Sequence, residues 1–329
     1  MALIRRRVWA QFVGVVLCTL AGVAWAQKYP SKTMSFVVPY PAGGGSDFVA
    51  RQIQPELSKL LGQAMIVDNV GGVGGALGVQ KVLSAPADGH TLLLGSPMEL
   101  VLTPLSMSTV KFKPEDLQLA AQLVTTSMVL ATRKDLPVNN IDELMQLIKK
   151  PGAKELSFGS VGYGSLYHLV AEKFAQQMGV KMIHVPYKGQ APLMADLMGG
   201  QIDFVFMPLV GAVPGMIQEG KFKALGVTSK TPNARLPQLA PLALHKALDD
   251  FEFDLWAGVE VPKNTPPEVV QRLNKVIYES LQNEGIRKAY EGTGNTVAKP
   301  MSVSELAQLY AKEIVRYQNI ARSINLQPQ

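Results

Sequence analysis

Short apolar runs alternate with longer stretches of helical apolar spacing along most of the chain. Short apolar runs are typical of buried strands, and apolar positions three and four apart are typical of helices that pack on a sheet. Strands are predicted at residues 34–38, 65–69, 90–96, 156–159, 182–187, 202–207, 222–228 and 255–261, with strand-like runs between 119 and 132. Helices are predicted at residues 48–57, 79–84, 141–149, 166–178, 191–197, 209–218, 268–283, 286–291 and 304–320. Strands that alternate with helices predict an α/β fold with a mainly parallel sheet.

Glycine-rich turns join a strand to a helix at residues 40–47, 71–78 and 160–165. In parallel sheets these turns lie at the carboxyl ends of the strands, where ligands bind. The first turn has three consecutive glycines, and the free amides of the helix that follows attract anions such as carboxylates. Ser46 and Asp47 are predicted N-caps of this helix, and for Asp47 a cap is favoured over direct ligand contact. The turn lacks the residues of a Walker A loop or a dinucleotide fingerprint, so an anion site and an ordinary turn remain alternatives.

Two α/β lobes are predicted, because a second series of alternating strands and helices begins after residue 132 and the chain then returns. Residues 27–128 and 253–329 form the first lobe, and residues 129–252 form the second. The chain crosses between them near residues 124–132 and 252–260. Domain interfaces are favoured ligand sites, so one anion is expected to be held in the cleft between the lobes.

The N-terminal segment has the pattern of a secretory signal peptide. Arg5, Arg6 and Arg7 precede an apolar run that ends in Ala24-Trp25-Ala26, so cleavage is expected after Ala26 and the mature protein in the periplasm. The alternative is a membrane anchor, for which the uncharged run is short. Cleavage removes Cys18, the only cysteine, and loss of three arginines and no acidic residue lowers the formal charge from +6 to +3. This charge, without basic clusters, argues against nucleic acid as a partner.

Several motifs resemble, in one order, those of the tripartite tricarboxylate transporter receptor family, the Bug or TctC-type periplasmic solute-binding proteins. They are Tyr29-Pro30-Ser31-Lys32, Val37–Asp47, Leu61-Gly62-Gln63, Asp88–Ser96, Gly159–Leu169, His184–Pro192, Gly199–Asp203 and Ala224–Ser229. The resemblance implies a two-lobed Venus-flytrap fold of the type II periplasmic binding protein kind. It implies capture of a small organic acid and its delivery to a large and a small membrane subunit. No cofactor and no metal are expected, and the protein is expected to act as a monomer.

The resemblance also implies which residues hold the acid, because family members use two loops that correspond to residues 40–47 and 160–168. The predicted ligand-binding residues are Tyr40, Pro41, Ala42, Gly43, Gly44, Gly45, Ser46, Asp47, Ser96, Ser160, Gly162, Gly164, Ser165, His168, Tyr187 and Met207. Tyr187 is favoured because a phenol both stacks and donates a hydrogen bond. For His168, ligand contact and a packing role are equally compatible with the sequence.

The sequence departs from the family pattern around the cleft, where Ala76-Leu77, Pro97–Leu100 and Met207-Pro208 replace more polar residues. Met98 and Met207 suggest a ligand less polar than citrate or an amino acid, for example an aromatic or alkyl carboxylate. Core packing is the stronger interpretation of both methionines. The sequence specifies neither the acid nor its affinity.

Two other functions remain open on the sequence. A periplasmic hydrolase could use Ser165, His168 and an aspartate, although neither Ser160 nor Ser165 lies in a Gly-x-Ser-x-Gly elbow. A sensor subunit could pass its ligand to a signalling receptor, and the sequence of one chain does not separate sensing from transport. Four scattered histidines without a glutamate at ligand spacing argue against a zinc site.

Overall fold

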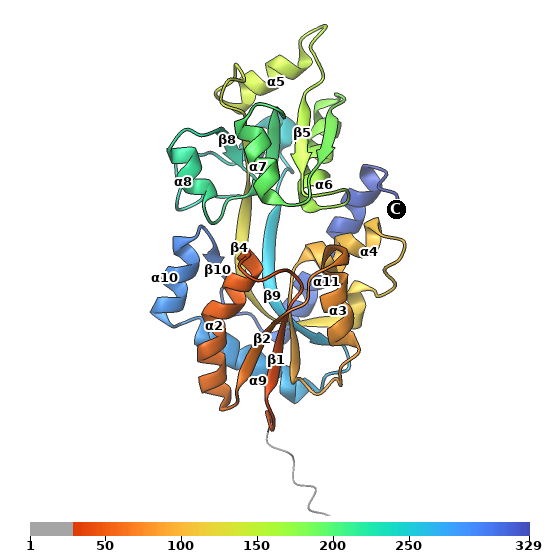
Figure 1. Cartoon of the computed structure of the whole chain (residues 1–329), viewed down its shortest axis with the longest axis vertical. Coiled ribbons are helices and arrows are strands. Elements are labelled where there is room, and N and C mark those ends of the chain that lie inside the picture. The colour runs from red at the N-terminus through yellow and green to blue at the C-terminus, as the bar shows by residue number, and fades with distance from the viewer. Residues whose placement is uncertain (1–28) are drawn as a thin grey trace, which may run out of the picture. The chain divides into compact units, whose positions relative to one another are not determined.

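The computed structural model describes residues 29–329. The predicted signal peptide at residues 1–26 therefore lies outside the described residues. Contacts divide the chain into Met1–Ser31 and Lys32–Gln329, and every helix and strand described below belongs to the second unit. Figure 1 shows two groups of helices around strands, joined by the strands β4 and β9.

The described strands form one continuous sheet in the order β2-β1-β3-β9-β4-β7-β5-β6, with β10 and β8 also paired to β4. Their bounds are β1 Met34–Val38, β2 Met65–Asn69, β3 Thr91–Gly95, β4 Leu117–Thr132, β5 Ser157–Ser160, β6 Ile183–Pro186, β7 Phe204–Pro208, β8 Lys223–Val227, β9 Asp254–Pro262 and β10 Thr296–Val297. Strand β1 is parallel to β2 and β3, and β5 is parallel to β6 and β7, as the sequence predicts for each group. Strands β4 and β9 pair antiparallel to their neighbours.

The predicted helices are present in the predicted order with shifts at their ends, and the sequence did not predict the short helix α4 or the helical turns. Their bounds are α2 Gly45–Leu61, α3 Ala76–Leu83, α4 Thr103–Ser106, α5 Ile141–Lys149, α6 Leu166–Met178, α7 Gln190–Met198, α8 Val213–Gln218, α9 Pro267–Ser280, α10 Glu284–Gly292 and α11 Val303–Ser323. A π-helical turn, η2, spans Met98–Leu102, and the 3₁₀ turns are η1 Val73–Gly75, η3 Pro114–Asp116, η4 Leu242–Leu244 and η5 Lys246–Leu248.

Strand β4 connects the two groups of strands. Its residues up to Ser127 pair with β9, and from Met128 onward they pair with β7 and β8. The sequence predicts only separate apolar runs here, because Thr125, Thr126 and Ser127 interrupt them. A single strand of 16 residues forms instead, since β-branched threonine suits a strand and Thr126 Oγ1 pairs with Asn295 Oδ1 at 2.6 Å. The predicted lobe boundaries at 128/129 and 252/253 stay a prediction.

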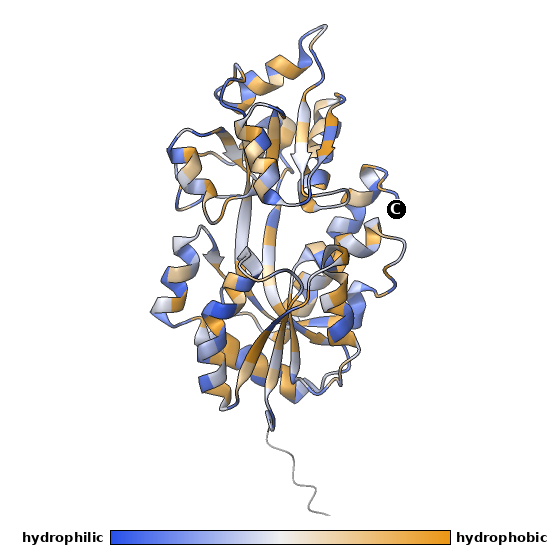
Figure 2. Cartoon of the chain, viewed as in Figure 1, coloured by the Kyte–Doolittle hydropathy of each residue, from blue (hydrophilic) through white to orange (hydrophobic). Residues whose placement is uncertain are grey.

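The core lies along the sheet, whose strands are mainly orange and white in Figure 2, while the surrounding helices carry both orange and blue segments. In the group around β5 and β7, the rings of Phe174, Phe204, Phe206 and Phe251 pack edge to face or tilted. All four are fully buried. Such aromatic packing gives the loops beside it a rigid support. Within residues 29–329, no helix has the length and apolarity of a membrane span.

Candidate functional site

The first glycine-rich turn is an exposed loop that ends in free helix amides. Residues 41–45 are exposed, and Gly43 adopts φ +83°, a conformation that favours glycine. Helix α2 begins at Gly45 and its N-cap is Gly44, which has no side chain to accept from the first turn. The amides of Gly45, Ser46 and Asp47 have no hydrogen-bond partner among residues 29–329. A bound anion is therefore a suitable partner for these amides.

The prediction that Ser46 or Asp47 caps α2 is wrong. Asp47 lies in the first turn, and its Oδ2 accepts the Gly43 amide at 2.9 Å while both carboxylate oxygens accept from Arg51 Nε at 2.9 Å. Three glycines let the chain turn one residue earlier than a side-chain cap requires. The hydrogen bond with Arg51 lowers the pKa of Asp47, although burial opposes the change. Asp47 is therefore ionised, and its carboxylate holds the loop through Gly43 and Arg51.

The loop is also fixed to the neighbouring strand. Arg51 Nη2 donates to Asn69 Oδ1 at 3.1 Å, and Asn69 Nδ2 donates to the carbonyl of Tyr40 at 3.1 Å. Gly71 packs on Pro41, because a Cβ on Gly71 would lie 3.2 Å from Pro41 Cδ. The shape of the loop is thus set before any ligand binds, which limits the ordering entropy lost on binding.

Beneath the loop lies Glu99, a fully buried carboxyl group that the sequence analysis did not single out. Its Oε2 accepts from Tyr40 Oη at 2.8 Å and from Ser96 Oγ at 2.7 Å, and its Oε1 accepts from the Ser96 amide. Burial raises the pKa of Glu99 to about 7, against the opposing effect of the hydrogen bonds from Ser96 and Tyr40. Two predicted ligand residues are therefore joined through one acid.

A second buried acid, Glu260 on β9, lies next to this group. A Cβ on Gly95 would lie 2.0 Å from Glu260 Oε2, so only glycine fits at the end of β3. Neither carboxyl oxygen of Glu260 has a hydrogen-bond partner within residues 29–329. Burial first, and then the charge of Glu99, raises the pKa of Glu260 well above its ordinary value, and the backbone of Gly95 only partly opposes this.

The second glycine-rich turn, at residues 71–78, packs against Glu99 and is not arranged around an anion. A Cβ on Gly75 would lie 2.6 Å from the Cβ of Glu99, and Gly74 and Gly75 adopt φ +60° and +93°. The carbonyl of Gly74 accepts from Thr103 Oγ1 at 2.9 Å. The glycines here make room for the turn η2 that carries Glu99.

The third glycine-rich turn leads into α6 and has a side-chain cap. Ser165 Oγ accepts the amide of His168 and donates to the carbonyl of Gly162 at 2.6 Å. The amides of Leu166 and Tyr167 have no partner among the described residues. Tyr167 is also close enough to Tyr40 for its charge to raise the Tyr40 pKa, after the larger effects of burial and Glu99. The first turn of α6 thus lies near the first loop.

Two histidines stack behind this turn. The rings of His168 and His184 lie 4.2 Å apart, and Phe158 stacks on His184 at 5.0 Å. Ser160 Oγ lies 2.6 Å from His184 Nε2, and the Gly164 amide donates to His168 Nδ1 at 3.2 Å. Burial, and then the neighbouring His168, lowers the pKa of His184 to about 4. His168 thus packs and accepts the Gly164 amide, and its contact with a ligand stays a prediction.

The third turn packs on Ser106 of α4. A Cβ on Gly164 would lie 2.1 Å from the Ser106 Cβ, so this loop of the second lobe packs directly on a helix of the first. Residues near the C-terminal end add further links, because Gln329 N donates to the carbonyl of Ser106 at 2.9 Å and Gln327 N donates to Tyr163 Oη at 3.2 Å. These contacts join the third turn to α4 and to the C-terminal residues, while the interaction of Tyr167 with Tyr40 is what places it near the loop at 40–47.

Tyr187 and Met207 are placed differently from the loop residues. The hydroxyl of Tyr187 donates to Asp196 Oδ2 of α7 at 2.8 Å, and the side chain is half-buried. Met207 is fully buried in β7, where it pairs with Val129 of β4. Met98, by contrast, is half-buried at the start of η2. Contact of Tyr187 and Met207 with a ligand stays a prediction.

A hydrolytic arrangement at Ser165 is not present in this geometry. Ser165 Oγ binds backbone groups, and the described hydrogen bonds do not join it to the His168 ring. His168 Nε2 faces Glu172 Oε1 at 3.7 Å. A nucleophile needs a base within hydrogen-bond reach, so this serine lacks the activating partner of a hydrolase.

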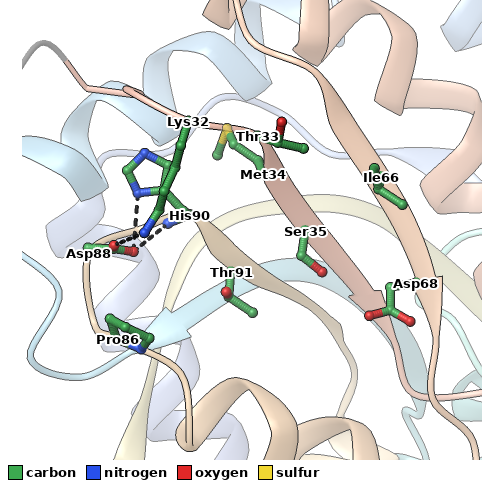
Figure 3. Close-up of a pocket in the computed structure, with 10 residues that line it drawn as sticks. All are labelled: Lys32, Thr33, Met34, Ser35, Ile66, Asp68, Pro86, Asp88, His90 and Thr91. Atoms are coloured by element: carbon green, nitrogen blue, oxygen red, sulfur yellow. Dashed lines mark hydrogen bonds and ion pairs between the residues drawn. The ribbon is translucent and has the colours of Figure 1, made fainter.

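A surface pocket of about 250 Å³ lies far from these loops, at the amino ends of β1 and β3 (Figure 3). It is lined by Lys32, Thr33, Met34, Ser35, Ile66, Asp68, Pro86, Asp88, His90 and Thr91. Lys32 Nζ and Asp88 Oδ2 lie 2.9 Å apart at its rim, as Figure 3 shows. Parallel sheets bind ligands at the other edge, so this pocket is not the candidate site. Within residues 29–329, no three His, Cys, Asp or Glu side chains cluster as metal ligands.

Sequence reasoning missed Glu99, Glu260 and His184 as parts of the site. Glu99 and Glu260 each interrupt an apolar run, at residues 97–102 and 259–261. An acid inside such a run is buried when the run is, and buried acids need partners or protons. This signal was available in the sequence, whereas the stacking of His168 on His184 depends on tertiary structure.

Comparison with known proteins identifies the family of the chain. Residues 49–326 match the family model described as "Tripartite tricarboxylate transporter family receptor". Among solved structures, periplasmic binding protein BugD is 29% identical with a TM-score of 0.77, covering 92% of this chain and 100% of that chain.

Two further solved structures hold ligands. Rpa4515 of R. palustris with adipate is 28% identical with a TM-score of 0.80, covering 92% of this chain and 100% of that chain. MatC of Rhodopseudomonas palustris with bound malate is 28% identical with a TM-score of 0.76, covering 89% of this chain and 99% of that chain. The fold is that of a two-lobed periplasmic binding protein, and the chain belongs to the tripartite tricarboxylate transporter receptor family.

Proposed function

We propose that this protein is an extracytoplasmic receptor that captures a small organic acid in the interlobe cleft, between the loops at residues 40–47 and 160–168, for a tripartite transporter. The observation that carries the proposal is the pair of helix N-termini, α2 and α6, whose first amides are free and whose first turns come close where Tyr167 interacts with Tyr40. Amides at a helix start favour a carboxylate both by hydrogen bonding and through the helix dipole.

Neutral donors, and not basic side chains, hold the acid in this proposal. Residues 40–47 and 160–168 include no lysine or arginine, and Arg51 is already paired with Asp47 and Asn69. Backbone amides, hydroxyl groups and water bind a carboxylate without a fixed counter-charge. Such a site discriminates by the placement of donors, so it suits acids that share one carboxylate and differ at the far end.

The structural neighbours narrow the class of ligand to be tested. They carry adipate and malate, two dicarboxylates of different length and polarity. Met207 and Met98 are the two reasons to expect a ligand with an apolar far end. Met207 is fully buried, which weakens the first of these reasons, whereas Met98 is half-buried and still supports the expectation. We therefore place aliphatic dicarboxylates first and aromatic acids second.

A thermal-shift screen of residues 27–329 tests the proposal. A ligand that binds only the folded state at one hundred times its Kd adds about 2.7 kcal/mol to stability, which raises the Tm. We expect a rise with at least one of adipate, malate, citrate, benzoate or an amino acid, and none with the corresponding neutral amide. The absence of a rise with every acid, after mass spectrometry has excluded a retained ligand, contradicts the proposal.

The role of Tyr187 is tested on the same acid. If its ring lines the cleft, Tyr187→Ala weakens binding at least tenfold, because a desolvated aromatic contact is worth more than about 1 kcal/mol. Tyr187→Phe keeps the ring and loses only the hydrogen bond to Asp196, so its affinity stays within threefold of the wild type. Equal affinity of Tyr187→Ala and the wild type would remove Tyr187 from the site.

Export and transport partners complete the proposal. The signal-like residues 1–26 support cleavage after Ala26 and a periplasmic location, and the family supports delivery to a large and a small membrane subunit. N-terminal sequencing of the exported protein tests the first point. Loss of acid uptake on deletion of this receptor, restored by its gene, tests the second.

A further inference from the structure

Two carboxyl groups, Glu99 and Glu260, are completely buried beside the first ligand loop, and neither has a cation partner. Among residues 29–329, no ion pair joins either group to a lysine, arginine or histidine. Two acids that interact in a dry site do not both ionise at neutral pH, because each charge must be desolvated next to the other. The pair therefore retains at least one proton.

The hydrogen bonds assign the first proton to Glu260. Glu99 accepts three donors, one on Oε1 and two on Oε2, as expected of a carboxylate. No side chain donates to either oxygen of Glu260 among the described residues, and the Gly95 backbone beside it only partly offsets burial, so the neutral form of Glu260 is preferred. Glu99 is left as the group whose charge changes near neutral pH, in line with its pKa of about 7.

The protonation state of Glu99 determines where the hydroxyl hydrogens of Tyr40 and Ser96 point. When Glu99 is ionised, Tyr40 Oη and Ser96 Oγ both donate to its Oε2, at 2.8 and 2.7 Å. When Oε2 carries a proton, the new O–H donates to one of these hydroxyl oxygens. That hydroxyl must then rotate its own hydrogen away from Glu99, and it becomes a free donor.

Resting on the proposed function, we propose that Glu99 takes up one proton when a carboxylate binds, and that this proton turns a hydroxyl of Tyr40 or Ser96 toward the ligand. The proton comes from solvent and forms an O–H bond on Glu99 Oε2, and no covalent bond breaks. The receptor thus binds an organic acid as an anion together with a proton. Glu99 is a positioning residue, which acts on the ligand through Tyr40 and Ser96.

The surroundings of the pair favour this coupling. Among the described residues, the ionisable groups with the largest effects on Tyr40 and Glu260 are Glu99 and Tyr167 of α6. Tyr310 of α11 interacts with both acids and with Glu115 and Asp116, and none of these groups is basic. With Glu260 neutral, a bound carboxylate adds a second negative charge beside ionised Glu99, and the loops at 40–47 and 160–168 carry no lysine or arginine to offset it. Neutralising Glu99 removes the repulsion and supplies a donor in the same step.

Titration calorimetry with adipate and with malate tests the inference on the wild-type protein. Proton uptake makes the observed heat depend on the ionisation enthalpy of the buffer, so measurements in phosphate and in Tris at pH 8 give the number of protons bound. We expect uptake approaching one proton at pH 8. Affinity should stay constant below about pH 6 and be about tenfold weaker at pH 8, since the proton is already present below the pKa of about 7 and must be acquired above it.

Glu99→Gln provides a variant that mimics the protonated acid. Its amide donates to Tyr40 or Ser96 while its oxygen still accepts the Ser96 amide. We expect an affinity that does not change with pH, about tenfold tighter than the wild type at pH 8, with no proton uptake. Asp254→Asn is the matched control. Asp254 lies at the start of β9, the strand that carries Glu260 near its other end, and burial raises its pKa to about 6. This variant should keep the wild-type pH profile.

The outcomes separate the inference from the function on which it rests. Binding of adipate or malate with equal heats in the two buffers and equal affinity at pH 6 and pH 8 overturns the inference and leaves the receptor function in place. Uptake that persists in a folded Glu99→Gln protein assigns the proton to another group and also overturns it. No binding of any acid in the screen contradicts the proposed function itself.

Discussion

At the residue scale, Asp47 does more for the first loop than an N-cap does. It accepts the Gly43 amide and pairs with Arg51, which in turn reaches Asn69. Asp47→Ala leaves the Gly43 amide and the guanidinium of Arg51 without this acceptor, so we expect a loss of about 1–3 kcal/mol in stability. We also expect binding of the acid found by the screen to weaken about tenfold, as the loop loses its fixed shape. Urea denaturation and calorimetry at pH 7 measure the two effects.

The pH dependence of this loss follows from the lowered pKa of Asp47, which its hydrogen bond with Arg51 causes. The stabilisation is complete above the ordinary carboxyl pKa of 3.8 and is lost as pH falls through the lower folded value. Asp68→Ala is the control, because Asp68 forms a more exposed ion pair with Lys81 and should change stability by less than about 1 kcal/mol. Equal effects of the two variants would contradict the role given to Asp47.

The contribution of Glu260 to stability changes with pH in the opposite sense to that of Asp47. Burial raises its folded pKa well above 4.5, so the folded state holds a proton that the unfolded state has released. Its contribution to stability is present below pH 4.5 and is lost as pH rises toward the folded pKa, by about 1.4 kcal/mol per pH unit. We expect Glu260→Gln, which keeps the shape and stays neutral, to be more stable than the wild type at pH 8 and equal to it near pH 4. Denaturation at the two pH values measures the difference, and a variant less stable at pH 8 would show that Glu260 is ionised and partnered.

Individual residues show where sequence reasoning was strongest and weakest. Local signals served well at the third turn, where the predicted helix at residues 166–178 is confirmed, with Ser165 as its N-cap and Gly179 as its C-cap. Asp47 was misplaced because three glycines allow two starting points for a helix, and only the fold selects one. Glu99 and Glu260 meet from η2 and β9, so their interaction has no local signature beyond a charged residue in an apolar run.

At the scale of elements, the order of strands and helices followed from apolar periodicity alone. The prediction failed where a strand changes its pairing partner. The sequence of β4 predicts separate apolar runs, but these residues form one strand that pairs first with β9 and then with β7 and β8. The helix predicted from Leu209 begins at Val213. The second glycine-rich turn looked like another anion site and instead packs on Glu99, because sequence does not tell whether a glycine admits a ligand or a side chain.

The contact of the third turn with α4 gives a prediction at this scale. Gly164 adopts φ +75°, and a Cβ there would lie 2.1 Å from that of Ser106. Gly179 adopts φ +68° with nothing within 4 Å of the added Cβ, so Gly179→Ala lowers the free energy of unfolding only by the backbone strain of about 1–2 kcal/mol. Gly164→Ala introduces the same strain and also pushes the third turn away from α4, which costs about 1–3 kcal/mol more. Chemical denaturation should rank the two variants in this order.

Small-angle X-ray scattering distinguishes backbone strain at residue 164 from separation of the third turn and α4. Gly164→Ala should increase the radius of gyration and weaken binding, while Gly179→Ala changes neither. Ser106→Gly removes the opposing Cβ, so the double variant Gly164→Ala with Ser106→Gly should regain the compact form. If the double variant stays as open as Gly164→Ala alone, the contact with Ser106 is not what the substitution disturbs.

At the scale of the whole described unit, the two groups of elements are joined in two ways. Strands β4 and β9 run from one group to the other and pair along most of their length. The third turn packs on Ser106, and helix α11 contacts α6, where Gln176 Nε2 donates to the carbonyl of Ser323 at 2.7 Å. Two strands allow a hinge motion, and a motion that separates the two groups would break these contacts. The residues that form them should therefore shift the balance between open and closed forms.

The last residues of the chain are the sharpest test of this balance. Gln329 bonds to Ser106 and Ser108, at 2.9 Å for each backbone bond, and Gln327 reaches Tyr163 Oη of the other lobe at 3.2 Å. Removal of residues 325–329 takes away these links and leaves β4, β9 and both ligand loops intact. We expect a larger radius of gyration without ligand, a Tm lower by a few degrees, and affinity weakened several-fold, because binding must now also supply the free energy of closure. Tyr163→Phe, which removes only the interlobe bond, should give a smaller change in the same direction, and a truncated protein as compact and as tight as the wild type would show that closure rests on Gly164 and Ser106 alone.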